Sequence, residues 1–153
     1  MHNPVVGGVL LAIHLLSVVA WVGGMFFALT VLRPSMGVID APQRVALHAQ
    51  VFRRFFLVIW HAMPLTLLSG FGMVFVVYGG FAGLNWSIHA MMGLGILMAL
   101  VFLAAFTGPW KRMRRAISTA AAAGAADRIR KLVLLNLVLG LIVVAIAGFG
   151  RFY

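Results

Sequence analysis

The sequence predicts an all-α protein, a four-helix bundle that spans a membrane, and three observations lead to this fold class. Of the 153 residues, 64% are hydrophobic and only 9% are charged, whereas soluble domains usually contain about 25% charged residues. Four long apolar stretches dominate the chain, and none of them contains Asp, Glu, Lys or Arg. Because backbone groups in hydrocarbon must be satisfied within their own segment, each stretch is expected to be a helix.

The four apolar stretches are the predicted spans, at roughly residues 5–32, 55–78, 86–108 and 132–149. A helix needs ~20 consecutive apolar residues to cross the hydrocarbon of a bilayer, and each stretch is close to that length or longer. No internal repeat and no Gly-, Pro- or Ser-rich linker divides the chain. We therefore expect residues 1–153 to form a single four-span domain.

The connections between the spans are expected to contain helix as well. Between the first two spans, residues 40–54 predict a short amphipathic helix that lies on the membrane surface. Asp40 can cap this helix, Pro42 suits its first turn, and Gln43 stands three residues after the cap. Between the last two spans, the Ala-rich run 119–126 is expected to be a helical spacer.

The charged residues predict the orientation of the bundle. The chain has 12 Lys and Arg against 2 Asp and Glu, a net charge of +10. Eleven of the twelve basic residues lie in the first and third connections or at their borders. By the positive-inside rule these connections are cytoplasmic and both termini face outward. We expect the membrane to be a bacterial inner membrane, with the termini in the periplasm if the bacterium is Gram-negative. The charge therefore predicts contact with a lipid bilayer and no nucleic-acid partner. The chain has no Cys, which excludes thiolate metal sites.

The spans carry three histidines, His14, His61 and His89, and ionisable side chains inside a membrane are functional candidates by default. His14 precedes Arg33 by 19 residues, and His89 precedes Lys111 by 22 residues. At about 1.5 Å per residue, the two lie about 28 and 33 Å from the inner face, on parallel helices. Neighbouring helices in a bundle are about 8–10 Å apart, so the two imidazoles could share one iron.

The first functional hypothesis is therefore a haem b protein with a redox or electron-transfer role. His14 and His89 would be the axial ligands of an iron held between the first and third spans. Such a role implies a redox partner or a quinone, and small-residue faces permit a homo-oligomer. The residues expected to wall the ring or to meet its propionates are Trp21, Met25, Gly93 and Arg151.

His61 lies about 10 Å from the inner face by the same count, too far from His14 to share a metal ion. It could hold a separate, inner metal site. It could instead satisfy local backbone, which the sequence favours, because Pro64 frees the carbonyl of Trp60 in the same helix. The sequence leaves both alternatives open.

Methionine suggests a second functional hypothesis, a Cu(I) transport or copper-tolerance protein. The chain has nine Met, and thioether sulfur together with imidazole nitrogen forms a soft ligand set that suits Cu(I). His14 and His89 would serve again, with Met91 or Met92 as sulfur ligands. Because Met is also an ordinary apolar filler of helical cores, a purely structural bundle is the third hypothesis.

Motifs along nearly the whole chain resemble one family of membrane proteins. The first span contains His-x6-Trp-x-Gly from His14, and the third opens with Trp-x-x-His, which ends at His89. The second span opens with Arg-Arg-Phe-Phe at 53–56, and the third closes with Gly-Pro-Trp-Lys-Arg at 108–112. In these motifs the chain resembles small stand-alone CopD-family membrane proteins and, more distantly, HemJ-type protoporphyrinogen oxidases.

The resemblance implies two kinds of chemistry. The CopD family implies copper handling, and the HemJ relatives imply a b-type haem. In the HemJ pattern, a His on the first helix and a Lys two residues after the third-helix His matter for haem and activity. His14 matches the first of these, and Met91 stands at the Lys position. This departure argues against protoporphyrinogen oxidation and leaves haem ligation open through His89 or Met91.

Overall fold

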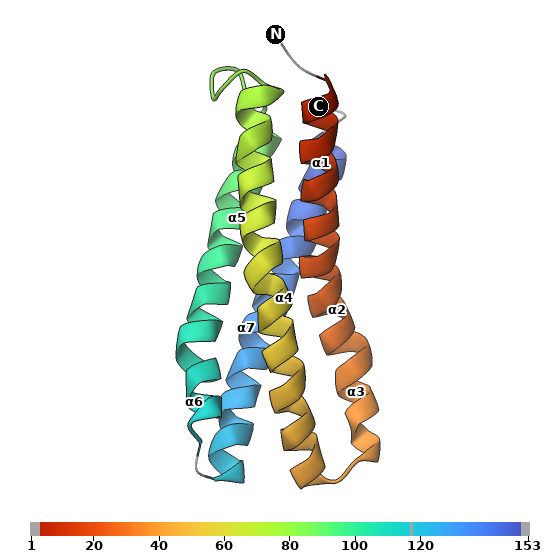
Figure 1. Cartoon of the computed structure of the whole chain (residues 1–153), viewed down its shortest axis with the longest axis vertical. Helices are drawn as coiled ribbons and strands as arrows, with labels where there is room; N and C mark the ends of the chain where they lie inside the picture. Colours follow the sequence, from red (N-terminus) through yellow and green to blue (C-terminus); the bar gives the residue numbers. More distant parts are fainter. Residues whose placement is uncertain (1–3, 117, 151–153) are drawn as a thin grey trace.

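In the computed structural model, the chain is a bundle of four long helical segments, with no strand among the residues described, which are 4–116 and 118–150. Figure 1 shows the segments running side by side, so that the first begins and the last ends at the same end of the bundle. The connection between the second and third segments lies at this end too. The all-α, four-helix fold predicted from the sequence is confirmed.

The first segment is a helix with two wider turns. A π-helical turn holds one extra residue, and such turns are frequent at functional sites. The first of them contains Trp21, whose side chain is buried in the core. The parts of this segment, in order, are α1 (Pro4–Val18), a π-helical turn (Val19–Gly23), α2 (Gly24–Phe27), a second π-helical turn (Ala28–Leu32), α3 (Arg33–Ser35) and a 3-10 turn (Met36–Val38).

The second segment is a single 36-residue helix, α4 (Ala41–Val76). It starts as predicted, because the Asp40 side chain accepts a hydrogen bond from the backbone N–H of Gln43 at 2.9 Å. The predicted surface helix 40–54 is not a separate element, however, but the first part of α4. No Gly or Pro separates it from the span that follows, so nothing in the sequence breaks the helix there.

The third segment comprises α5 (Trp86–Ala105), a π-helical turn (Phe106–Trp110) and α6 (Lys111–Arg114), and the fourth is α7 (Thr119–Phe149). The Ser118 side chain caps α7 by accepting a hydrogen bond from the backbone N–H of Ala121 at 3.2 Å. The Ala-rich run 119–126 is thus the start of the last long helix and not a spacer before it. Alanine is the best helix former, and the cap lies ahead of the run.

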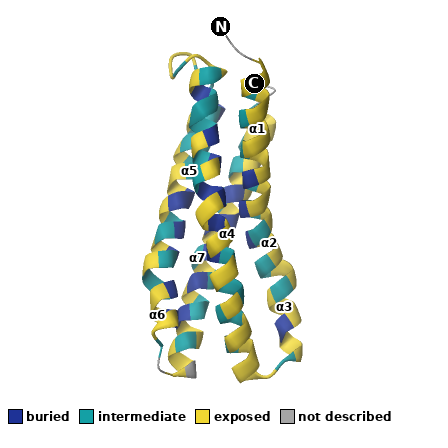
Figure 2. Ribbon diagram, viewed as in Figure 1, coloured by how far each residue is buried: buried dark blue, intermediate teal, exposed yellow. Residues whose placement is uncertain are grey.

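All four segments are long and apolar enough to cross a membrane. Figure 2 shows buried residues towards the interior of the bundle and exposed residues along its outer faces. Many of the exposed side chains are large and apolar; Leu16, Leu68 and Leu134 are each more than half exposed. Apolar outer faces of this extent fit contact with lipid, as expected for a multi-pass membrane protein.

An aromatic cluster fixes α4 against the third segment in the half of the bundle nearer the α3–α4 connection. The buried ring of Phe56 lies 5.6 Å from the rings of Phe102 and Phe106 and 5.2 Å from that of Trp110, between centroids. Trp60 stacks on Phe106 at 5.1 Å. Such ring pairs add to the stabilisation that burial provides, so they hold α4 and the third segment together.

Gly140 allows α7 to approach the first and third segments closely. A Cβ atom at this position would lie 2.9 Å from Cγ2 of Val22 and 3.1 Å from Cε of Met98. We expect Gly140→Ala to lower the free energy of unfolding by about 1–3 kcal/mol, because the neighbouring side chains would have to move. Gly148→Ala is the matched control, since a Cβ there would meet nothing within 4 Å. Identical thermal unfolding of the two variants in detergent would contradict this packing.

Candidate functional site

A cavity of about 140 Å³ lies between the helical segments, towards the end of the bundle where α4 stops and α5 starts. Its walls are mostly apolar, and His14 is the one imidazole among them. We refer to it as the His14 cavity. Its lining residues are His14, Val18, Trp21, Val22, Thr66, Leu67, Gly70, Phe71, Met73, Val74, Tyr78, Ile88, Met91, Met92, Gly95, Met98, Gly140 and Val143.

The imidazole of His14 is held in one orientation by α4. Its Nδ1 lies 2.9 Å from the carbonyl oxygen of Thr66 and 3.2 Å from the hydroxyl oxygen of Ser69. A carbonyl oxygen only accepts hydrogen bonds, so Nδ1 carries the proton and donates it. The Ser69 hydroxyl donates its own proton to a backbone carbonyl of α4 and therefore also accepts from His14. The other nitrogen, Nε2, keeps the lone pair that a metal ion binds.

Gly70 brings α4 close to this imidazole. A Cβ atom at Gly70 would lie 3.1 Å from Cε1 and 3.4 Å from Nδ1 of His14. Any larger residue would therefore push the ring away from its hydrogen-bond partners. In metal sites, a hydrogen bond to the nitrogen that does not bind the metal fixes the tautomer and the direction of the ring. His14 has this arrangement.

Four methionines line the same cavity as His14. Met73 belongs to α4, and Met91, Met92 and Met98 belong to α5. Met91 and Met92 are the two residues that the sequence suggests as sulfur ligands for copper. The cavity therefore combines one imidazole nitrogen with several thioether sulfurs, and its lining contains no carboxylate.

His89 is not among the residues that line the His14 cavity. It is exposed, and its Nδ1 lies 3.3 Å from the carbonyl oxygen of Asn85, one turn earlier. The face of α5 towards the cavity follows helical spacing from Ile88 through Met91, Met92 and Gly95. His89 lies next to this stripe and not on it, so the structure does not bring His14 and His89 to one cavity.

The other residues predicted to surround a haem lie in different environments. Trp21 lines the His14 cavity, whereas Met25 is 1% exposed and packs in the core. Gly93 lies on an exposed face of α5, and Gly95 lines the cavity in its place. Arg151 lies outside the described residues.

His61 is exposed on α4, and its Nδ1 lies 2.8 Å from the carbonyl oxygen of Leu57, four residues earlier. Among residues 4–116 and 118–150, no three His, Cys, Asp or Glu side chains lie close enough together to hold a metal ion. A metal site in this part of the chain would therefore need donors of other residue types. The His14 cavity offers one such donor, the sulfur of methionine.

Two buried polar atoms in the described part of the chain lack a hydrogen-bond partner, Nε1 of Trp21 and Oδ1 of Asn136. Both residues line a narrow cavity of about 10 Å³ to which all four segments contribute. The indole Nε1 only donates and the amide Oδ1 only accepts, so the two atoms are chemically complementary. Trp21 also lines the His14 cavity and so separates the two cavities.

The contribution of α4 to the site was not predicted from the sequence. Thr66, Ser69 and Gly70 position His14, and Met73 adds a further sulfur atom. Positions 66, 69, 70 and 73 have the spacing of one helix face. This spacing is the signal that could have found them, although an apolar helix offers many such faces.

The family model described as "CopD: Copper resistance protein D" matches residues 49–149, more than half of the chain. The matched region contains the cavity walls from α4, α5 and α7, whereas His14 precedes it. No curated protein and no solved structure matches the chain.

Proposed function

The chain belongs to the copper resistance protein D (CopD) family, and on this premise we propose that it binds Cu(I) in the His14 cavity, as a membrane carrier or copper-tolerance protein. The family points to copper resistance at a membrane in general terms. The observation that carries the more specific proposal is that His14 and several methionines surround one cavity.

The softness of the ligands favours Cu(I) over Cu(II). Thioether sulfur selects Cu(I), whereas Cu(II) prefers nitrogen and oxygen ligands in a tetragonal arrangement. The lining of the cavity provides an imidazole and four thioethers but no carboxylate. All of these ligands are neutral, so a bound monovalent ion would bring less charge into the hydrocarbon than a divalent ion would.

His14 is the proposed nitrogen ligand, through Nε2, because its Nδ1 is engaged with Thr66 and Ser69. This arrangement presents the lone pair without a change of tautomer. Met91 and Met92 are the proposed sulfur ligands from α5. Because several thioethers line the cavity, the ion could pass from one sulfur to another, as release from a carrier requires.

A haem b centre with His14 and His89 as axial ligands is the competing hypothesis, and it implies a redox partner or a quinone. Pockets that take organic ligands usually measure about 300–1,000 Å³. The His14 cavity is smaller, at about 140 Å³, and His89 is exposed outside its lining. The observations therefore favour a single ion over a macrocycle, and no step of the proposed function involves haem.

The test of the proposal is Cu(I) binding by the purified full chain in detergent. Competition with a chromogenic Cu(I) chelator, under anaerobic reducing conditions, is expected to give about one Cu(I) per chain. The visible absorption spectrum of the same sample is expected to show no Soret band. A Soret band with the sharp α and β bands of a six-coordinate haem, and no uptake of Cu(I), would favour haem b and overturn the proposal.

For the orientation, we propose that the α3–α4 and α6–α7 connections face the cytoplasm of a bacterial cell. The distribution of basic residues supports this proposal, because the connection between α4 and α5, residues 77–85, contains none. In this orientation the His14 cavity lies in the outer half of the membrane. Copper would then reach the site from the outer side.

Single cysteines can test this orientation, because the chain has no Cys of its own. Ala82 lies in the connection between α4 and α5, Ala120 lies in the first turn of α7 beside the α6–α7 connection, and both are exposed. We expect Ala82→Cys to react with a membrane-impermeant maleimide in intact spheroplasts. Ala120→Cys is expected to react only after the membrane has been permeabilised. The reverse pattern would contradict the proposed orientation.

A further inference from the structure

A second cavity, of about 650 Å³, lies at the opposite end of the bundle, where α3, the first turns of α4 and the first half of α7 meet. Its lining includes the three guanidinium groups of Arg33, Arg44 and Arg130, together with the imidazole of His48. Asp127 provides the one carboxylate of this lining. We refer to it as the arginine cavity, and its lining carries an excess of positive charge.

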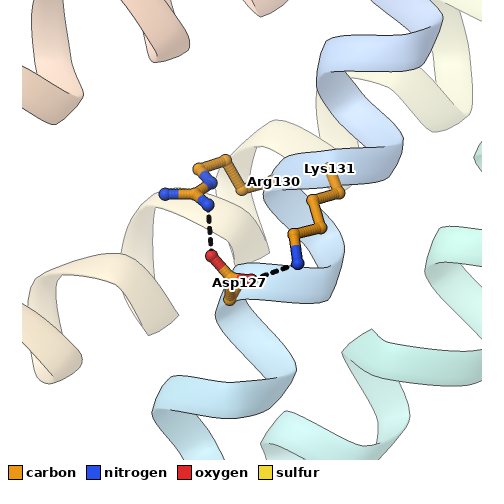
Figure 3. Close-up of polar contacts among 3 residues, drawn as sticks. All are labelled: Asp127, Arg130 and Lys131. Atoms are coloured by element: carbon orange, nitrogen blue, oxygen red, sulfur yellow. Dashed lines mark ion pairs between the residues drawn. The ribbon is translucent and has the colours of Figure 1, made fainter.

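The carboxylate of the arginine cavity is already engaged. Asp127 pairs with Arg130 and, at 3.0 Å, with Nζ of Lys131, as Figure 3 shows. Arg44 donates one hydrogen bond, from Nη2 to the carbonyl oxygen of Ile39 at 2.9 Å. The guanidinium of Arg33 has no hydrogen bond or salt bridge in the part of the chain that the structure describes. Arg33 and Arg44 therefore retain donors that can bind an anion.

The remaining walls of the arginine cavity are apolar. Leu29 and Leu32 come from the first segment, Phe52 and Phe55 from α4, and Val133 from α7. These residues lie deeper within the spans than the arginines do. The cavity is therefore charged near the end of the bundle and apolar towards the hydrocarbon. A ligand that fits both parts has an anionic head and an apolar chain.

We propose that the arginine cavity binds an anionic phospholipid, with the headgroup phosphate between Arg33 and Arg44. Guanidinium groups bind phosphate through paired, charge-assisted hydrogen bonds. Basic pockets between membrane helices suit anionic headgroups. The acyl chain would lie along Phe52 and Phe55. A free phosphate ion could satisfy the arginines, but it would leave these apolar walls without a partner. This inference does not depend on copper binding.

The test is lipid binding to the full-length protein, measured by native mass spectrometry in detergent. Dioleoyl phosphatidylglycerol is expected to bind more tightly than dioleoyl phosphatidylethanolamine. Arg33→Gln combined with Arg44→Gln is expected to weaken the binding of phosphatidylglycerol about tenfold or more. Arg112→Gln combined with Arg128→Gln is the matched control, because it removes the same charge from exposed residues outside the cavity. This control pair is expected to bind nearly as the natural chain does.

A variant that keeps all charges tests the shape of the site. Ala126 lines the cavity, so Ala126→Phe would place a ring inside it and is expected to weaken the preferential binding of phosphatidylglycerol. The proposal would be overturned if both arginine double variants lost the same amount of phosphatidylglycerol binding. Full binding of phosphatidylglycerol by Ala126→Phe would also overturn it. Displacement of phosphatidylglycerol by millimolar inorganic phosphate would also overturn it, because the site would then be one for small anions. Size-exclusion chromatography shows whether each variant remains folded.

Discussion

Replacing His14 by Ala is expected to lower the affinity of the protein for Cu(I) by about 100-fold or more. Even partners that only orient a metal ligand contribute about 10–100-fold to affinity, so loss of the ligand itself should cost at least as much. His14 is the one imidazole of the cavity, and its Nε2 is the free nitrogen. The measurement is chelator competition with the purified variant.

Two comparisons make the His14 result specific. His89→Ala is expected to leave Cu(I) affinity unchanged, because His89 lies outside the cavity, whereas it would abolish a centre that both histidines clamp. Gly70→Ala is expected to lower the Cu(I) affinity less than His14→Ala does, because the new Cβ would lie 3.1 Å from Cε1 of His14 and displace the ring. Gly93→Ala is its control, since a Cβ there would meet nothing within 4 Å. Unchanged affinity in His14→Ala would refute the assignment of this ligand.

The second large effect is expected from the methionines of α5. Met91→Leu combined with Met92→Leu should lower Cu(I) affinity by about 10–100-fold, because it removes two soft sulfur atoms. Leu has nearly the volume of Met, so the change in packing should be small. Both side chains line the cavity beside His14.

The matched control for this variant replaces two methionines elsewhere in the core. Met36 and Met113 are buried, at 4% and 6% exposure, and neither lines the His14 cavity. Met36→Leu combined with Met113→Leu is expected to retain the affinity of the natural chain for Cu(I). Equal affinities in the two double variants would mean that the thioethers of α5 serve only as apolar packing.

The spans and the start of α4 could be predicted from the sequence because the membrane imposes simple rules. A long apolar stretch without charges must form a helix in hydrocarbon, and four such stretches give four spans. The cap at Asp40 depends on a local contact with Gln43, and local contacts follow from neighbouring residues. The length of α4 could not be read from hydropathy, since polar residues at its start continue the same helix.

The rotation of α5 about its own axis could not be predicted from the sequence. This helix is apolar nearly all round, so its sequence has no period that distinguishes an inner face from a lipid-facing one. Counting residues gives the depth of His89 but not its direction, and the structure turns it away from the cavity. The hydrogen-bond partners of His14 could not be predicted for a similar reason. Thr66 and Ser69 lie more than 50 residues away along the chain and meet His14 only through packing.

The most direct test of the central claim is X-ray absorption at the copper edge of the Cu(I)-loaded natural protein. We expect an edge typical of Cu(I) and a first coordination shell that contains both nitrogen and sulfur. The nitrogen contribution should be lost in His14→Ala, and the sulfur contribution should be reduced in Met91→Leu combined with Met92→Leu. A shell of nitrogen and oxygen alone, or a protein that binds no copper, would contradict the claim that the His14 cavity is a copper site.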